Sequence, residues 1–285
     1  MFGIIVELFS FPFVVKALIV GGLVSLCAAL LGVSLVLKRY SMIGDGLSHV
    51  GFGTLGLAAA LGIASPLKIS VPLVLLAAFG LLRLSESGKI KGDAAIALVS
   101  SGSLAIGSII VESKGLNADL TGYMFGTILA VGGEDLYISS GIAIAVAAAY
   151  IFFYNRIFAV TFDEDFSKAT GVNVKLYNTV LAALTALVVV VGMRVMGALL
   201  ISGLIIFPAL TAMRVFKNFK SVVVCSAVVS IVCFFSGIIL SYVRERATGL
   251  RTPAGASVVV ANLAVFLAFT AAGIARRKLK GRKRR

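Results

Sequence analysis

Long apolar segments recur along this chain, and they constrain its fold more than any other feature of the sequence. A membrane-spanning helix needs about 20 mostly apolar residues. Nine segments approach that length, so the sequence predicts an all-α protein that crosses a membrane about nine times, as a single transmembrane domain over residues 1–285. The expected spans are residues 13–37, 47–63, 69–84, 93–111, 136–154, 176–194, 196–215, 221–243 and 254–275.

The composition agrees with a membrane protein. Apolar residues make up 60% of the chain and charged residues only 13%, whereas a soluble domain is about half apolar and about a quarter charged. This excludes a soluble enzyme, a disordered chain and an ordinary nucleic-acid-binding domain. A further apolar stretch, residues 120–131, is too short to cross, and we expect a short helix that enters from one face with its ends buried in protein or water.

The positive charge is concentrated at the C-terminus. Of the 26 basic residues, eight lie in the tail 276–285, directly after the last apolar segment, which is typical of a cytoplasmic anchor on anionic lipid. If the tail is cytoplasmic, nine spans place the N-terminus outside, with nineteen basic residues inside and seven outside. This agrees with the positive-inside rule. We therefore expect a multi-pass inner-membrane protein with no nucleic-acid partner.

The strongest local signal is the pair Asp45 and His49 at the inner start of the second expected span. Residues four apart share one face of a helix, and His49 is the only histidine in the chain. A carboxylate oxygen and an imidazole nitrogen are ligands that zinc and manganese accept. Two ligands do not make a site, but two copies across a two-fold axis would supply four. The alternative is that Asp45 caps the helix and His49 is a packing residue.

Four motifs, in order, resemble the zinc and manganese permeases of the ABC transporter superfamily. They are LKRYSMIGDGLSH at 37–49, DLTGYMFGTILAV at 119–131 followed by Glu-Asp-Leu at 134–136, GALLISGLIIFPA at 197–209 and TPAGAS at 252–257.

This resemblance implies the membrane subunit of a type II ABC importer, with a fold similar to the vitamin B12 permease and a homodimeric pore. It implies a separate cytoplasmic ATPase dimer, which alone binds ATP, and an extracytoplasmic metal-binding protein. Asp45 and His49 match the positions that face the pore and bind the ion in transit. The family carries zinc, manganese and ferrous iron, and residues 123–136 are more similar to the zinc permeases. Where those often have an acidic residue, however, this chain has Thr127.

The inside loop 155–175 is expected to couple the chain to the ATPase. Its acidic start, followed by small and apolar residues and a glycine, predicts a short surface helix. The resemblance implies that this segment docks into the ATPase, and the alternative is a solvated loop. The expected contact residues are Phe162, Asp163, Glu164, Phe166, Ala169 and Gly171. We expect no ATP hydrolysis by the chain itself, because it has no G-x-x-x-x-G-K-[ST] phosphate loop.

Other residues are weaker candidates. Pro208 lies within the seventh expected span, as a hinge or as a static kink. Ser202 either lines the pore or bonds its own helix backbone. The outside charged loop with Arg244, Arg246 and Arg251 either meets acidic parts of a binding protein or is simply solvated.

Two other functional classes compete with an importer subunit. A secondary transporter driven by an ion gradient is the main alternative, but it is expected to carry more intramembrane carboxylates and often an inverted repeat. An intramembrane metalloprotease needs a motif such as H-E-x-x-H, which one histidine cannot supply.

Overall fold

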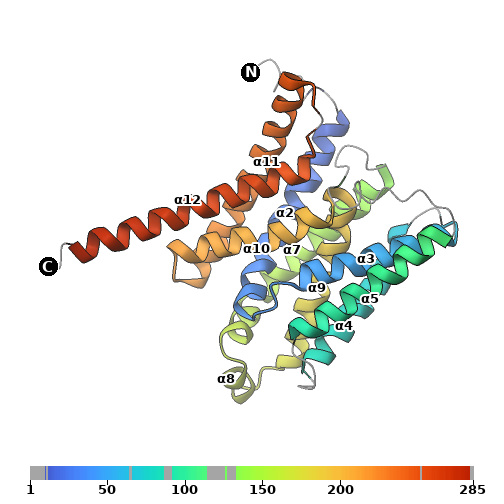
Figure 1. Ribbon diagram of the computed structural model, residues 1–285. Coiled ribbons are helices and arrows are strands. Elements are labelled where there is room, and N and C mark those ends of the chain that lie inside the picture. Colours follow the sequence, from blue (N-terminus) through green and yellow to red (C-terminus); the bar gives the residue numbers. More distant parts are fainter. Residues whose placement is uncertain are drawn as a thin grey trace.

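The computed structural model describes residues 10, 12–63, 66–86, 92–113, 126, 133–250 and 252–282. Within these residues the chain forms nine helices of 18 or more residues and one short helix, and no strand (Figure 1). The long helices are α2 (Pro12–Leu37), α3 (Ile43–Ala60), α4 (Pro66–Glu86), α5 (Gly92–Ser113), α7 (Gly133–Phe162), α9 (Val174–Met196), α10 (Ala198–Val215), α11 (Phe219–Thr248) and α12 (Ala254–Arg282). The short helix is α8 (Glu164–Ala169).

Each of the nine expected spans coincides with one long helix, which confirms the prediction of an all-α membrane protein. Eight of the described helices are long and apolar enough to cross a membrane. The remaining long helix is α3, whose hydropathy is lowered by Asp45, Ser48 and His49. Of the short segment expected at 120–131, only Gly126 belongs to the described residues.

Several helices extend beyond their expected ends. α7 continues past Tyr154 to Phe162, so the first part of the segment 155–175 is helical. α11 continues to Thr248 and ends at Gly249, which adopts a left-handed conformation with φ of 70°. Arg244 and Arg246 therefore lie in the last turns of a helix rather than in a loop, while Arg251 lies outside the described residues. The length of an apolar segment reflects only the part of a helix that lies inside the membrane. The helix itself continues beyond that part until a residue such as Gly249 ends it.

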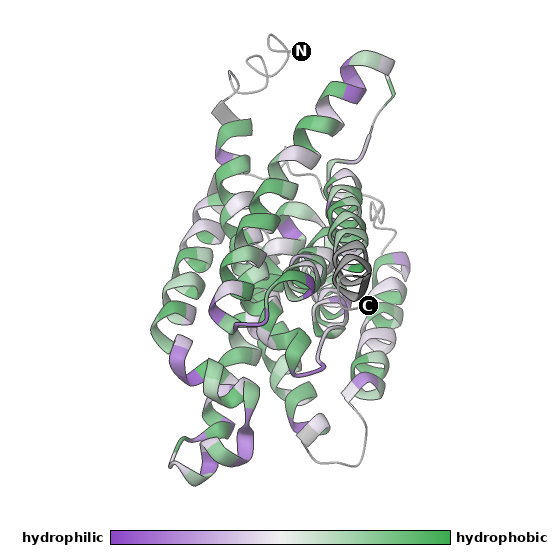
Figure 2. Cartoon of the chain, turned by 90° about the vertical axis from the view of Figure 1, so that its left-hand side faces the viewer, coloured by the Kyte–Doolittle hydropathy of each residue, from purple (hydrophilic) through white to green (hydrophobic). Residues whose placement is uncertain are grey.

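Helices α2 and α9 form the interior of the bundle, and each is mostly buried. α2 packs against α7, α9, α10 and α11, and α12 packs on the outside against α10 and α11. The second half of α12 projects away from the other helices (Figure 1). Apolar residues cover most of the helical surface, and hydrophilic residues gather towards the helix ends (Figure 2). This is the distribution that a membrane requires.

Helix α3 is held by close contacts with three other helices, made possible by its glycines. A Cβ at Gly44 would lie 2.7 Å from Ile205 Cδ1 in α10, and one at Gly53 would lie 2.8 Å from the carbonyl oxygen of Ser103 in α5. At Gly51 a Cβ would collide with Met193 in α9. Small residues let membrane helices approach closely, so these contacts fix the position of α3 and of the side chains that it carries.

Candidate functional site

The candidate site lies on a partly exposed face of α3. Asp45, His49, Gly53 and Leu57 follow one another at four-residue intervals, and all four are partly exposed. Most other residues of this helix are buried. These four residues form a partly exposed stripe along α3, which we call the accessible stripe. Both predicted ligands lie on it, as expected for residues four apart in a helix.

The two side chains lie close to each other on this stripe. His49 Nε2 is 3.7 Å from Asp45 Oδ2, and the side chains are 25% and 41% exposed respectively. The other imidazole nitrogen, Nδ1, is buried and has no hydrogen-bond partner among the described residues. A buried polar atom without a partner is costly and is typical of places where a ligand or a second molecule completes the contacts.

The reading of Asp45 as a helix cap does not agree with the structure. The N-cap position of α3 is Met42, and it makes no side-chain cap hydrogen bond. Asp45 lies inside the first turn, where a negative charge is still favourable near the helix N-terminus. Because its side chain is 41% exposed, a cation can reach the Asp45 carboxylate.

One copy of the chain supplies an incomplete metal site. Among the described residues, no group of three or more His, Cys, Asp or Glu side chains is placed to hold a metal ion. A tetrahedral zinc shell needs four ligands, and Asp45 with His49 provides two.

The same helix contains the spacing G-x-G-x-x-G, at Gly51, Gly53 and Gly56. In dinucleotide-binding proteins this pattern follows a strand and opens a helix. Here it lies in the middle of α3, and a Cβ at Gly56 would lie 3.3 Å from the carbonyl oxygen of Gly107 in α5. These glycines serve helix packing.

The predicted surface helix before Gly171 is present as α8. Asp163 is its N-cap, because its carboxylate accepts a 2.8 Å hydrogen bond from the Phe166 backbone N–H. Gly171, with φ of 81°, follows the end of the helix. Phe166 is 65% exposed and Ala169 is also exposed, so both side chains are accessible to another protein.

Phe162 differs from the other expected contact residues. It is the last residue of α7, and its ring lies 5.0 Å from that of Phe158 and 5.8 Å from that of Phe219. Although it is exposed, part of its role is to pack the end of α7 against the start of α11.

Glu164 points back towards the membrane helices, and its partner was not identified from the sequence. Lys38, in the turn between α2 and α3, places Nζ 2.6 Å from Glu164 Oε1 and 2.6 Å from Asn178 Oδ1 in α9. Asn178 Nδ2 also donates to Glu164 Oε1, at 3.3 Å. Burial alone would raise the pKa of Glu164, but the hydrogen bonds and charge of Lys38, with Asn178 and Lys168, outweigh it and lower the pKa. From the sequence alone, Lys38 was only one of the basic residues expected on the cytoplasmic side.

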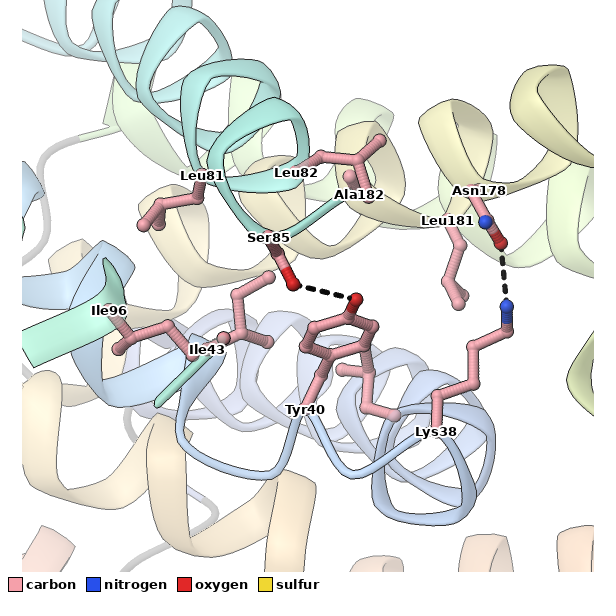
Figure 3. Close-up of a pocket in the computed structure, with 12 residues that line it drawn as sticks. Lys38, Tyr40, Ile43, Leu81, Leu82, Ser85, Ile96, Asn178, Leu181 and Ala182 are labelled. Atoms are coloured by element: carbon pink, nitrogen blue, oxygen red, sulfur yellow. Dashed lines mark hydrogen bonds between the residues drawn. The ribbon is translucent and has the colours of Figure 1, made fainter. Parts of the chain in front are cut away.

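A small pocket lies beside these residues (Figure 3). Across it the Tyr40 hydroxyl and the Ser85 hydroxyl are 3.0 Å apart and hydrogen-bonded. Its lining consists of Leu35, Lys38, Tyr40, Ile43, Leu81, Leu82, Ser85, Gly92, Ile96, Asn178, Leu181 and Ala182. The pocket therefore lies between four parts of the chain: the end of α2 with the turn after it, α4, the start of α5, and α9.

The remaining candidate residues lie elsewhere. The Ser202 hydroxyl donates to the carbonyl oxygens of Ala198 and Leu199 in its own helix, and Pro208 is buried within α10. Arg244 and Arg246 are exposed at the end of α11, at the opposite end of the molecule from α8 (Figure 1).

Comparison with known proteins gives matches over nearly the whole chain. A family model described as the ABC 3 transport family matches residues 10–273. The chain is 31% identical over 262 residues to "High-affinity zinc uptake system membrane protein ZnuB" of Haemophilus influenzae, covering 90% of this chain and 96% of the relative. It is 29% identical over 279 residues to "Manganese transport system membrane protein MntC" of Listeria monocytogenes, covering 92% and 91%. The solved structure "PsaBC from Streptococcus pneumoniae in complex with Fab" matches with a TM-score of 0.81 and 30% identity, over 94% of each chain.

Proposed function

The chain belongs to the ABC 3 transport family, and from this premise we propose that it forms the membrane pathway of an importer for a divalent transition metal ion. Zinc is the first candidate substrate, followed by manganese and ferrous iron. The observation that carries this proposal is the pair Asp45 and His49, 3.7 Å apart on the accessible stripe of α3. The family match favours this function over a secondary transporter driven by an ion gradient.

A carboxylate and an imidazole on the open face of a membrane helix are costly if they face lipid. They are favourable if this face lines a water-filled path or meets another protein. We propose that two copies meet so that two Asp45–His49 pairs face one pore, which supplies the four ligands that one chain lacks. Binding there is transient, because an ion that must leave the pore cannot be held tightly.

The exposed residues at the two ends of the molecule suggest where its partners bind. α8 presents Phe166 and Ala169 outwards, and we propose that this helix docks into a separate ATPase dimer in the cytoplasm. The chain itself then hydrolyses no ATP. The end of α11, which carries Arg244 and Arg246, lies at the opposite end of the molecule from α8 (Figure 1). An extracytoplasmic metal-binding protein would meet these residues there, with Arg251 nearby in the sequence. We propose that the N-terminus is outside and that the basic tail 276–285 is in the cytoplasm, against anionic lipid.

ATP-dependent uptake of radioactive zinc and manganese tests the proposal. The chain is reconstituted in vesicles with its ATPase and binding protein, and the wild type is compared with two matched variants. His49→Phe keeps an aromatic ring but removes the metal ligand, whereas His49→Cys keeps a ligand that zinc accepts. We expect uptake by the wild type, no uptake by His49→Phe and partial zinc uptake by His49→Cys.

Uptake by His49→Phe at the wild-type rate would overturn the role of the Asp45–His49 pair. A wild-type complex that contains all three components and moves no divalent metal would overturn the proposed substrate class. The ratio of zinc to manganese uptake identifies the preferred ion.

A further inference from the structure

We propose that Lys38 is a positioning residue that links movement of the ATPase-docking helix α8 to the metal-carrying helix α3. The inference rests on the proposed function, because it concerns how ATPase movement reaches the Asp45–His49 pair. Three residues form the link, which we call the clasp: Lys38 after α2, Glu164 in α8 and Asn178 in α9. They come from three separate elements and close a triangle of hydrogen bonds.

The clasp is built more firmly than an ordinary surface ion pair. The Lys38 side chain is only 7% exposed, while that of Glu164 is 44% exposed, and the Lys38 ammonium group has two acceptors at 2.6 Å. Figure 3 shows the Lys38 side chain extended along the pocket to reach Asn178. A nearly buried lysine that loses its carboxylate partner leaves an uncompensated charge, which is strongly unfavourable. Glu164 and Lys38 therefore tend to move together.

The other ion pair of α8 provides a contrast. Lys168 and Asp165 are 3.3 Å apart within the same short helix, and their side chains are 58% and 95% exposed. Exposed pairs of this kind contribute little, and this pair connects α8 to no other element. The bonds of Glu164 to Lys38 and Asn178 join α8 to the membrane helices.

Lys38 is placed to pass movement on to α3. It begins the turn 38–42, in which Arg39 adopts a left-handed φ of 63°, unusual for a residue other than glycine. The turn leads directly into α3, and Tyr40 in the same turn bonds Ser85 at the end of α4. Because α3 is held by close glycine contacts, a displacement of its first residues is transmitted along the helix to Asp45 and His49 rather than absorbed by bending.

The experiment separates docking from transmission in vesicles that contain the chain, its ATPase and its binding protein. Three quantities are measured for each variant: the amount of ATPase retained, the rate of ATP hydrolysis and the number of radioactive zinc ions taken up per ATP. Lys38→Met and Glu164→Gln each break the clasp. Lys217→Met is the matched control, since Lys217 is an exposed lysine between α10 and α11, outside the segment 155–175.

We expect Lys38→Met and Glu164→Gln to retain the ATPase and hydrolyse ATP, but to take up about tenfold less zinc per ATP, within the usual range of coupling between sites. Lys217→Met is expected to behave as the wild type. The exchange Lys38→Glu with Glu164→Lys restores an ion pair between the same positions, and it should recover most of the uptake per ATP. A purely structural defect would not recover in this way.

Normal zinc uptake per ATP in Lys38→Met would overturn the clasp while leaving the proposed function standing. Loss of the ATPase from Lys38→Met would also overturn it, because the clasp would then hold the docking surface rather than transmit movement. Failure of the wild type to take up any metal would overturn the proposed function, and the role of the clasp with it.

Discussion

Replacement of Gly107 by alanine should loosen the contact that positions the candidate site. Gly107 lies in α5, where α5 crosses α3, and a Cβ there would lie 2.7 Å from Gly53 Cα and 3.2 Å from Phe52 Cδ1. An ordinary contact between carbon atoms is about 3.5–4.0 Å. The nearest atom belongs to the backbone of α3, so the two helices must separate by about 1 Å to admit the methyl group.

The size of the effect follows from two opposing contributions. Alanine is better than glycine inside a helix by about 1 kcal/mol, whereas overpacking a close contact costs about 1–3 kcal/mol. Gly102 in the same helix is the matched control, since a Cβ there meets nothing within 4 Å in the described residues. Gly102→Ala gains the higher helix propensity of alanine without the steric clash. The free energy of unfolding should therefore be lower for Gly107→Ala than for Gly102→Ala by about 1–3 kcal/mol.

Thermal unfolding in detergent measures this difference. For a chain of this size 1 kcal/mol shifts the melting temperature by about 2–4 °C, so Gly107→Ala should melt about 2–12 °C below Gly102→Ala. Metal uptake should also fall in Gly107→Ala, because the shift of α3 displaces Asp45 and His49. Equal melting temperatures for the two variants would refute the close contact between α3 and α5. Gly80→Ala is a second control, because a Cβ at Gly80 also meets nothing within 4 Å in the part of the chain that the structure describes. It should melt at about the same temperature as Gly102→Ala.

Three further predictions concern the two ends of the molecule. Phe166→Asp should abolish co-purification of the ATPase while Phe166→Leu retains it, and equal recovery of ATPase with both variants would contradict docking through this exposed ring. The pKa of Glu164 is lowered in the folded chain, so its ionised form stabilises the fold above its ordinary value of 4.5, and this stabilisation is lost as the pH falls through the lowered pKa. Glu164→Gln should therefore lose less stability than the wild type when unfolding is compared at near-neutral and acidic pH, and an equal loss would contradict the Lys38 pairing. Arg244→Ala should slow association of the binding protein most at low salt, because salt screens exposed charges beyond about 10 Å at 0.1 M. Surface plasmon resonance measures the association rate, and a rate equal to that of the wild type at every salt concentration would contradict this contact.

The spans could be predicted from the sequence because the membrane imposes a length of apolar chain on each crossing. The ends of α7, α11 and α12 could not, because a helix continues into the aqueous region after its apolar stretch stops. The common face of Asp45 and His49 followed from the helical period alone. The clasp did not, because Lys38 and Glu164 are 126 positions apart and no local pattern connects them. Only the tertiary fold brings them together, with Glu164 of α8 2.6 Å from Lys38 in the turn after α2.

The packing of α3 and the clasp have one mechanical consequence in common. Glycines place the backbone of α3 against α5, α9 and α10, and close-packed helices shift as rigid units because a small bend would open or crush many contacts at once. Movement of α3 must therefore be taken up at its ends, and the end nearest α8 is the turn 38–42. In that turn Lys38 is tied to α8 and α9, while Tyr40 is tied to α4. A shift of α8 that keeps the Lys38–Glu164 pair thus acts on the chain five residues before α3 begins at Ile43. The hydrogen bond between Tyr40 and Ser85 resists this shift. Breaking the hydrogen bond of Tyr40 with Ser85 should ease this movement, whereas breaking the clasp should uncouple it, so the two changes alter uptake per ATP in opposite directions.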